Sequence, residues 1–220
     1  MQSVLVCFAL REEATPFKKI AAGRSAPTQA PTILITGIGH QNANEMVREA
    51  FAANLPSLVL TCGFAGGLNP KLKSGDVVFG LVESAVSLQQ LATRLFAAGA
   101  KEAKFFCSRH FVVTAAEKQK LYDQSGADAV EMESEVIHTL CRKHGIPSAT
   151  IRVILDTATE DLPLDFNQLT RPDLRIHHSK LAMAVMKSPG KIVSLFRLFG
   201  RSKLAAQRLA EVLAKVIWPG

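Results

Sequence analysis

Cysteine is scarce in this sequence, and its placement excludes several classes of protein. The 220 residues hold four cysteines, which are scattered and lie in or beside apolar runs: Cys7, Cys62, Cys107 and Cys141. Small secreted domains pair their cysteines in disulfide frameworks, and zinc sites use short ligand spacings. We therefore expect buried thiols in a reducing compartment. The histidines show no ligand pattern, so we expect no metal.

Long apolar runs are also missing. None reaches the roughly 20 residues that a membrane-spanning helix needs. The N-terminal MQSVLVCFAL is apolar but lacks a basic start, and Arg11, Glu12 and Glu13 follow it directly. This pattern predicts a first β-strand rather than a signal peptide. We expect a cytoplasmic protein.

No internal repeat and no low-complexity linker divides the chain, so we expect one domain over residues 1–220. The apolar content of 48% and the charged content of 20% are ordinary for a globular protein. The basic residues are not interleaved with aromatic ones and form no known module. Nucleic-acid binding is therefore not expected.

Acidic residues are nearly absent from the C-terminal part. Residues 171–220 hold ten Lys or Arg but only Asp173 and Glu211 as acids, although the whole chain carries a net charge of +7. Residues 190–218 alternate apolar with basic side chains, which predicts a basic amphipathic helix. Such a helix can lie on an anionic membrane surface. The alternative is a helix packed on the sheet with a solvated basic face.

Short apolar runs alternate with helical patterns along the rest of the chain. This alternation predicts an α/β fold with a mainly parallel central sheet flanked by helices. Glycine-rich turns are expected at residues 37–39 and 62–67, and a lid-like loop at 163–172. Strands are expected at residues 4–10, 32–36, 57–61, 77–82, 111–113 and 150–155. Helices are expected at residues 12–22, 42–53, 88–98, 115–122, 133–144, 181–187 and 192–216.

Two acidic segments carry the chemistry of the predicted sheet. Residues 130–135 close a short apolar stretch with Glu131, Glu133 and Glu135, and Asp156 ends the apolar run of residues 151–155. Open α/β sheets place their chemistry beyond the carboxyl ends of strands. Two acids on consecutive elements can divide substrate binding and proton donation between them.

Four motifs recur in the order of a known family. They are Phe8-Ala9-Leu10-Arg11-Glu12-Glu13, Thr36-Gly37-Ile38-Gly39 with Asn42-Ala43, the stretch from Cys62 to Val78, and Val130-Glu131-Met132-Glu133. Together with Asp156 they resemble the nucleoside phosphorylase and nucleosidase superfamily, which includes the 5'-methylthioadenosine/S-adenosylhomocysteine nucleosidases. The resemblance runs from the N-terminus to about Phe166. It implies a three-layer phosphorylase/hydrolase-like fold and a homodimer.

The resemblance also implies roles for three acids. Asp156 would protonate N7 of a purine and so make the base a better leaving group. Glu13 would orient or deprotonate the attacking water. Glu133 would bind the ribose 2'- and 3'-hydroxyls, since an ionised carboxylate accepts several hydrogen bonds. Carboxylates near the sugar would stabilise its oxocarbenium-like charge.

The other substrate contacts that the resemblance implies are apolar or made by the backbone. Met132 would pack on the sugar and Phe111 would stack on the base. Val112 would offer backbone hydrogen bonds to the base, and Phe166 would close the far side.

Each of these residues also has an ordinary structural interpretation. Glu13 and Glu133 could be first-turn acids stabilised by helix dipoles. Asp156 could serve an Asx turn or an N-cap. Met132 and Phe111 could be core side chains.

Three features depart from the family pattern. Gly63 and Phe64 lie in the glycine-rich segment, where backbone N–H groups can approach a ligand, but Phe64 stands where the nucleosidases usually carry a small serine. The stretch from Asp76 to Phe111 is shorter than in those nucleosidases, which puts their 5' specificity in doubt. The basic tail is similar to that of hopanoid-associated phosphorylase-like members.

The expected function is cleavage of the N-glycosidic bond of a purine nucleoside or a 5'-modified adenosine. Hydrolysis is preferred and needs no cofactor. The first alternative is phosphorolysis, with phosphate as co-substrate. Phosphate needs cations around it, for which Arg11 is the candidate and Arg109 and His40 are weaker ones. The second alternative is a nucleoside-binding module without catalysis.

Overall fold

A computed structural model describes residues 3–24, 30–82, 86–169, 190 and 192–218. Its strands form one mixed sheet in the order β2-β1-β3-β8-β4-β5, with β7 paired to β3 and β6 paired to β7. The strands are β1 Val4–Phe8, β2 Thr32–Ile35, β3 Leu58–Gly67, β4 Val77–Leu81, β5 Lys101–Glu102, β6 Phe105–Cys107, β7 Ala129–Glu131 and β8 Ser148–Asp156.

Most neighbouring strands run parallel. The pairs β1–β2, β1–β3, β3–β8, β4–β5 and β6–β7 are parallel, whereas β4–β8 and β3–β7 are antiparallel. The central strands β3 and β8 are buried along nearly their whole length, as expected for parallel strands covered on both faces. The predicted α/β fold with a mainly parallel sheet is confirmed.

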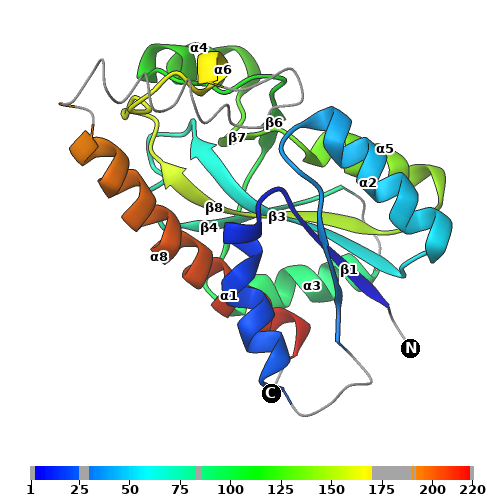
Figure 1. Cartoon of the computed structure of the whole chain (residues 1–220). Coiled ribbons are helices and arrows are strands. Elements are labelled where there is room, and N and C mark those ends of the chain that lie inside the picture. The colour runs from blue at the N-terminus through cyan, green and yellow to red at the C-terminus, as the bar shows by residue number, and fades with distance from the viewer. Residues whose placement is uncertain (1–2, 25–29, 83–85, 170–189, 191, 219–220) are drawn as a thin grey trace.

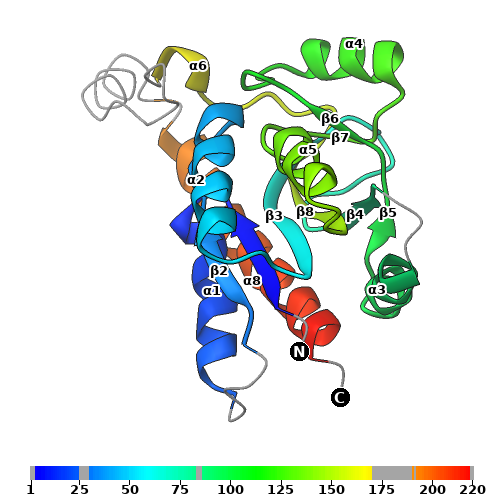
Figure 2. The same ribbon diagram turned by 90° about the vertical axis from the view of Figure 1, so that its right-hand side faces the viewer.

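Helices cover both faces of the sheet and one end of it (Figure 1). The helices are α1 Arg11–Ala22, α2 His40–Ala53, α3 Val86–Ala97, α4 Ala115–Ser125, α5 Ser134–Lys143, α6 Phe166–Leu169 and α8 Ile192–Ile217. One apolar core joins α1, α3 and α8 to the sheet, and a second joins α2 and α5 to its other face. Figure 2 shows α4 and α6 apart from each other at the end of the molecule toward which β8 runs. This arrangement is the expected three-layer fold.

The glycine-rich segment at residues 62–67 is strand and not turn, so that prediction is wrong. It continues β3, pairing with β8 as far as Gly66 opposite Asp156, with a register shift after Ala65. Gly66 and Gly67 then pair with β7. Sheet partners on both sides supply the hydrogen bonds that keep the glycines extended.

The strand predicted at residues 111–113 is also wrong. The nearby strand is β6, Phe105–Cys107, which pairs with β7. At Phe111 the side chain of Asn167, rather than a strand, takes the backbone hydrogen bonds. Residues 166–169 of the expected loop form α6, and the helix expected at 181–187 lies outside the described residues.

The four cysteines are free thiols. Cys7, Cys62 and Cys141 are buried, whereas Cys107 is only half-buried. Desolvation raises the pKa of the Cys7, Cys62 and Cys107 thiols. In the described part of the chain, no helix has the length and apolar character needed to cross a bilayer.

Candidate active site

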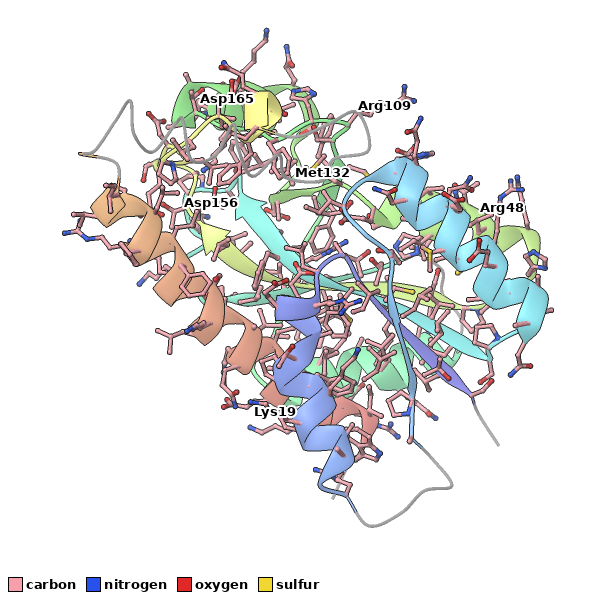
Figure 3. The ribbon with its side chains drawn as sticks, viewed as in Figure 1. Lys19, Arg48, Arg109, Met132, Asp156 and Asp165 are labelled. Atoms are coloured by element: carbon pink, nitrogen blue, oxygen red, sulfur yellow. The ribbon has the colours of Figure 1, made fainter. Side chains whose placement is uncertain are left out.

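Acidic side chains converge at the carboxyl edge of the sheet. Glu13 lies in the first turn of α1 just after β1, Glu131 ends β7, Glu133 precedes α5, and Asp156 ends β8. All four are buried, with exposed fractions of 3%, 3%, 5% and 8% respectively. Figure 3 shows Asp156 and Met132 at the end of the sheet beneath α4 and α6. Carboxylates remain in such a place only when they are paired or hydrogen-bonded.

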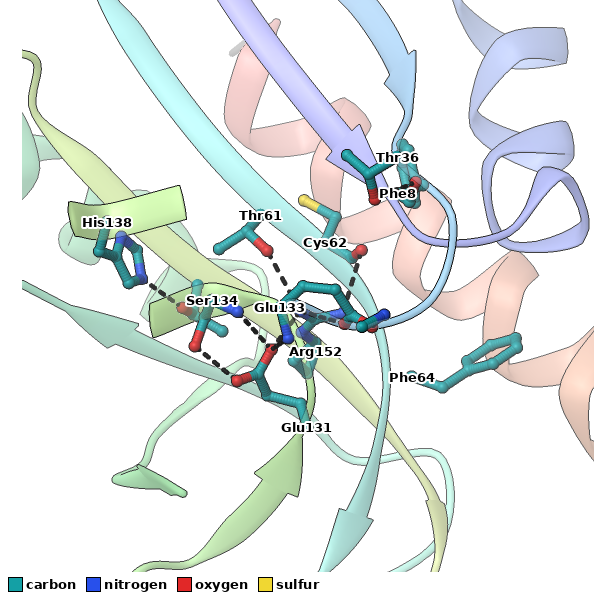
Figure 4. A network of polar contacts seen from close by, with 12 residues as sticks. Phe8, Thr36, Thr61, Cys62, Phe64, Glu131, Glu133, Ser134, His138 and Arg152 are labelled. Atoms are coloured by element: carbon teal, nitrogen blue, oxygen red, sulfur yellow. Dashed lines mark hydrogen bonds and ion pairs between the residues drawn. The ribbon is translucent and has the colours of Figure 1, made fainter. Parts of the chain in front are cut away.

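Arg152 of β8 is the cation that organises this cluster (Figure 4). Its Nη2 donates to Oε2 of Glu131 at 2.5 Å, to Oε2 of Glu133 at 3.2 Å and to Oγ1 of Thr61 at 3.1 Å. Its Nη1 donates to the carbonyl of Cys62 at 3.3 Å. Arg152 is not among the site residues expected from the sequence. A single cation inside an apolar run is nevertheless a usable signal, because a buried charge requires partners.

Glu131 is held as a carboxylate by more than Arg152. It accepts the backbone N–H groups of Glu133 and Ser134 at 3.0 and 2.8 Å and the Ser134 hydroxyl at 2.6 Å. Burial pushes its pKa up, but the Arg152 guanidinium and these donors outweigh burial, and the pKa of Glu131 lies below its usual range. Glu131 is thus a fixed negative charge that binds the backbone N–H groups where α5 begins.

Glu133 is less strongly held. Its Oε1 accepts the backbone N–H of Gly39 at 2.8 Å, and its Oε2 has the longer contact to Arg152. Burial and the charge of Glu131 raise its pKa despite Arg152 and the backbone donors. Met132, beside it, is buried at 8% exposure. The glycine turn before α2 is therefore connected directly to the segment that the sequence analysis assigned to ribose.

Glu13 joins α1 to β3. Its Oε1 accepts the backbone N–H of Phe64 at 2.8 Å, and its Oε2 accepts that of Leu10 at 2.9 Å, which caps α1. Burial raises the pKa of Glu13 to about 7, although Arg152 and both backbone donors oppose the rise. Glu12 is exposed, so Glu13 alone of the two faces the cluster. A carboxyl that titrates near neutrality is suited to accept a proton.

Gly63 must be glycine for this packing. Its φ is +149°, and a Cβ there would lie 2.7 Å from both Nη1 of Arg152 and Oε1 of Glu13. Phe64 contributes its N–H to Glu13, but its half-buried ring packs against the core under α8 and points away from Arg152 (Figure 4).

Asp156 has a partner that the sequence did not suggest. The Nζ of Lys118, in α4, lies 2.5 Å from Oδ2 of Asp156 and has no exposed side-chain surface. It also donates to the carbonyls of Thr157 and Glu160 at 2.8 and 2.6 Å. Burial raises the pKa of Asp156, and Lys118 counteracts the rise. A Cβ on Gly66 would lie 3.4 Å from Oδ2, so β3 also borders this carboxyl.

Aromatic and backbone groups form a wall where α6 meets the segment before α4. The rings of Phe111 and Phe166 lie 5.7 Å apart. The side chain of Asn167 bonds both the N–H and the carbonyl of Phe111 at 2.8 Å. Val112 is buried, and its backbone makes no hydrogen bond to another described residue. The wall thus combines two rings with the backbone of Val112, which no other described residue bonds.

The proposed phosphate ligands are not gathered at the cluster. Arg11, His40 and Arg109 are all exposed, and none forms an ion pair with another described residue. The described residues also include no group of three or more potential metal ligands.

A separate cavity of about 810 Å³ lies between β4, β6 and α5. Its described lining includes Ser134, His138 and Thr150 but neither Glu13, Glu133 nor Asp156. His138 is held there by Ser148 and Thr150 at 2.8 Å each. The buried acids, not the volume of this cavity, therefore mark the candidate active site.

Solved structures share this architecture over nearly the whole chain. A futalosine hydrolase mutant of Helicobacter pylori is 19% identical with a TM-score of 0.70, covering 99% of both chains. The 5'-methylthioadenosine/S-adenosylhomocysteine nucleosidase of the same organism, with butyl-thio-DADMe-Immucillin-A, is 22% identical with a TM-score of 0.69, covering 99% of this chain and 98% of that one. The corresponding nucleosidase of Campylobacter jejuni is 16% identical with a TM-score of 0.65, covering 98% and 100%. At these identities the likeness shows the fold.

The sequence itself matches a family model. The model of the phosphorylase superfamily matches residues 10–81 and 81–187, which include Glu13, Glu133 and Asp156. By this match, which extends over most of its length, the chain belongs to the phosphorylase superfamily.

Proposed function

We propose that this protein hydrolyses the N-glycosidic bond of a purine nucleoside or a 5'-modified adenosine. One observation carries the proposal. Two buried acids, Glu13 and Asp156, lie at one edge of the sheet and have different partners. Paired acids whose environments differ can act as base and acid in one reaction. The similarity to a futalosine hydrolase and to nucleosidases supports the same chemistry.

Asp156 acts on the base in this proposal. The purine packs against the wall formed by Phe111 and Phe166, with its edge on the backbone of Val112, and Asp156 protonates N7. The bond from C1' to N9 then breaks, and its electron pair stays with the purine. Protonation lowers the cost of that departure because the base leaves without negative charge.

Glu133 and Glu13 act on the sugar and the water. Glu133 accepts hydrogen bonds from the ribose hydroxyls, and Met132 packs against the ring. The carboxylates near the sugar stabilise its positive charge. Glu13 takes a proton from the water that attacks C1', so the products are free ribose, or a 5'-modified ribose, and the base.

Phosphorolysis is the alternative within the superfamily. It needs cations free to bind phosphate, whereas the buried guanidinium of Arg152 is already bonded to Glu131 and Glu133. Arg11 is exposed on the first turn of α1 and remains the candidate for a phosphate ligand. Three buried carboxylates around Arg152 repel an anion, which favours water.

Base release from a panel of nucleosides tests the function directly. The panel is adenosine, inosine, 5'-methylthioadenosine, S-adenosylhomocysteine and a bulky 5'-alkyl adenosine, each with and without phosphate. Equal release of free ribose product in both buffers is expected. Phosphate-dependent formation of ribose 1-phosphate would establish the phosphorylase alternative. Tight calorimetric binding of an adenosine analogue without any base release would establish the binding module.

We further propose a cofactor-independent, single-domain homodimer in the cytoplasm. Sedimentation of the purified chain tests the dimer, and a monomer at micromolar concentration contradicts it. Activity that survives exhaustive chelation and dialysis would support independence from a cofactor.

Peripheral membrane contact through α8 belongs to the same proposal. The first half of α8 exposes Val193, Phe196 and Leu204 to 57%, 73% and 74%, among exposed cations such as Arg197 and Lys203. Apolar and basic side chains on one helix suit an anionic lipid surface. Co-sedimentation with anionic but not zwitterionic vesicles is expected, and Phe196→Ser should weaken it. Equal recovery in the supernatant with both vesicles contradicts the contact.

A further inference from the structure

Lys118 is the buried residue of an otherwise exposed or half-buried helix. The other residues of α4, Ala115–Ser125, are at least partly exposed, whereas Lys118 has 0% exposure. Removing an ammonium group from water costs several kcal/mol unless partners compensate it. Apolar packing therefore does not explain why this position of α4 points inward.

The partners of Lys118 match an ammonium group. Its Nζ lies 2.5, 2.8 and 2.6 Å from Oδ2 of Asp156, the carbonyl of Thr157 and the carbonyl of Glu160. Three acceptors take three N–H donors, which an ammonium has and a neutral amine lacks. Lys118 thus carries a positive charge against the carboxyl and holds the loop that follows β8.

No other described cation is bonded to Asp156. The charge of Glu160 raises the pKa of Asp156, and the Oε1 of Glu160 is paired with Arg201 of α8 at 2.7 Å. The Oε2 of Glu160 accepts from the backbone and hydroxyl of Thr157, at 3.0 Å each. Among the described residues, Lys118 is therefore the cation that is bonded to Asp156 and that opposes the rise of its pKa.

We propose that Lys118 is a positioning residue for base release, which holds Oδ2 of Asp156 so that Oδ1 faces the purine and stabilises the carboxylate formed when the proton leaves. This inference rests on the proposed function. Lys118 donates a hydrogen bond to Oδ2, whereas Oδ1 accepts no hydrogen bond from another described side chain.

The charges balance through the step. Before it, Asp156 is neutral with its proton on Oδ1, and Lys118 is positive. The proton moves from Oδ1 to N7, the C1'–N9 bond breaks, and its electron pair stays on the purine. Asp156 becomes a carboxylate that is already paired with Lys118, which stays positive. The charge that the proton brought to the purine passes to the ribosyl group when the C1'–N9 bond breaks. Water then adds to C1' and gives its proton to Glu13.

Lys118→Met tests this role because the side chains have similar length and only one carries charge. Loss of the ammonium removes the group that counteracts burial, so the pKa of Asp156 rises further. Since the protonated acid is the active form, the fall in rate at alkaline pH should move up by roughly one to three pH units. The plateau kcat should fall about 10- to 100-fold with little change in KM.

Two variants control this measurement. Lys120→Met removes the same charge from an exposed position of α4 and should leave the profile unchanged. Lys118→Arg keeps the charge and should keep the position of the alkaline limb. A uniform loss of kcat in Lys118→Met, with the limb unmoved, overturns the proposal and leaves Lys118 as a purely structural residue.

A titration without substrate separates this proposal from the proposed function. In protein labelled with carboxyl ¹³C-aspartate, with Asp156→Asn as the assignment control, the Asp156 carboxyl should titrate at higher pH in Lys118→Met than in wild type. Equal titration overturns the proposal, even if no nucleoside is cleaved. If Lys118→Met fails to fold, the wild-type ammonium ¹⁵N signal of Lys118 serves instead. It should shift as Asp156 titrates, and an unresponsive signal overturns the proposal.

Discussion

Nη2 of Arg152 lies 2.5 Å from Oε2 of Glu131, and neither side chain has more than 1% of its surface exposed. The same nitrogen reaches Glu133 only at 3.2 Å, and the side chain of Glu133 is 7% exposed. Glu131 therefore neutralises most of the buried charge of Arg152. Glu133, with the longer contact and the raised pKa, is the less strongly held carboxyl and the one that we propose binds the substrate.

Arg152→Met should destabilise the fold strongly. It leaves Glu131 buried without its cation, and breaking a buried ion pair in this way costs about 3–5 kcal/mol. Chemical denaturation measures the loss. The double variant Glu131→Gln with Arg152→Met should be less destabilised than the sum of the single variants. A loss below about 1 kcal/mol in Arg152→Met would show that the pair contributes little.

Asp156→Asn should abolish base release while the fold persists. The amide oxygen still accepts a hydrogen bond from Lys118, but the amide cannot donate its proton to the purine as an acid. The expected loss in kcat is about 10²- to 10⁴-fold, and circular dichroism checks the fold. Asp123→Asn, an exposed change on α4, is the control. Near-normal turnover in Asp156→Asn removes Asp156 as general acid.

Glu13→Gln should remove the acid limb of the activity profile. The pKa of Glu13 is about 7 because of burial, and we propose that its ionised form accepts the proton of water. Wild-type kcat/KM should therefore rise with pH through about 7, and Glu13→Gln should be slow at every pH. Glu12→Gln, at the exposed neighbouring position, should follow the wild type. An unchanged acid limb in Glu13→Gln would contradict the role of Glu13.

The same residue makes stability depend on pH. The pKa of Glu13 is raised in the folded state from 4.5 to about 7. Its contribution to stability is therefore fully present below pH 4.5 and is lost as the pH rises through 7. Relative to wild type, Glu13→Gln should gain stability between pH 5 and 8, on the order of 2 kcal/mol. A constant difference between the denaturation midpoints of the two proteins across this range would exclude the linkage.

Gly63→Ala should lower both stability and activity. The new Cβ would meet Arg152 and Glu13 at 2.7 Å, at a φ of +149°. Gly75→Ala is a matched control, since its φ is +89° but nothing lies within 4 Å of the added Cβ. Both variants carry backbone strain of about 1 kcal/mol or more. Only Gly63→Ala should also reduce base release, measured as kcat/KM at equal folded fraction. Similar kcat/KM in the two variants would contradict the close packing at Gly63.

Local pattern determined much of this protein. Continuous apolar runs predicted the buried strands β1 and β8, and helical periodicity predicted α1, α2 and α8, because these elements bury the faces that their own residues define. The position of Asp156 at the end of β8 and of Glu13 after β1 follows from the same patterns. Parallel strands bring their carboxyl ends to one edge, so the acids were expected to lie together.

Tertiary structure decided the rest. The glycines of residues 62–67 are extended because β8 and β7 pair with them on both sides, and no local pattern encodes partners that follow more than 60 residues later. Lys118 resembles any surface lysine of a polar helix until α4 is placed over β8. Arg152 becomes the hub of the site only when β7 and β3 bring Glu131 and Thr61 to it. Both contacts join residues far apart in the sequence, so they exist only in the folded chain.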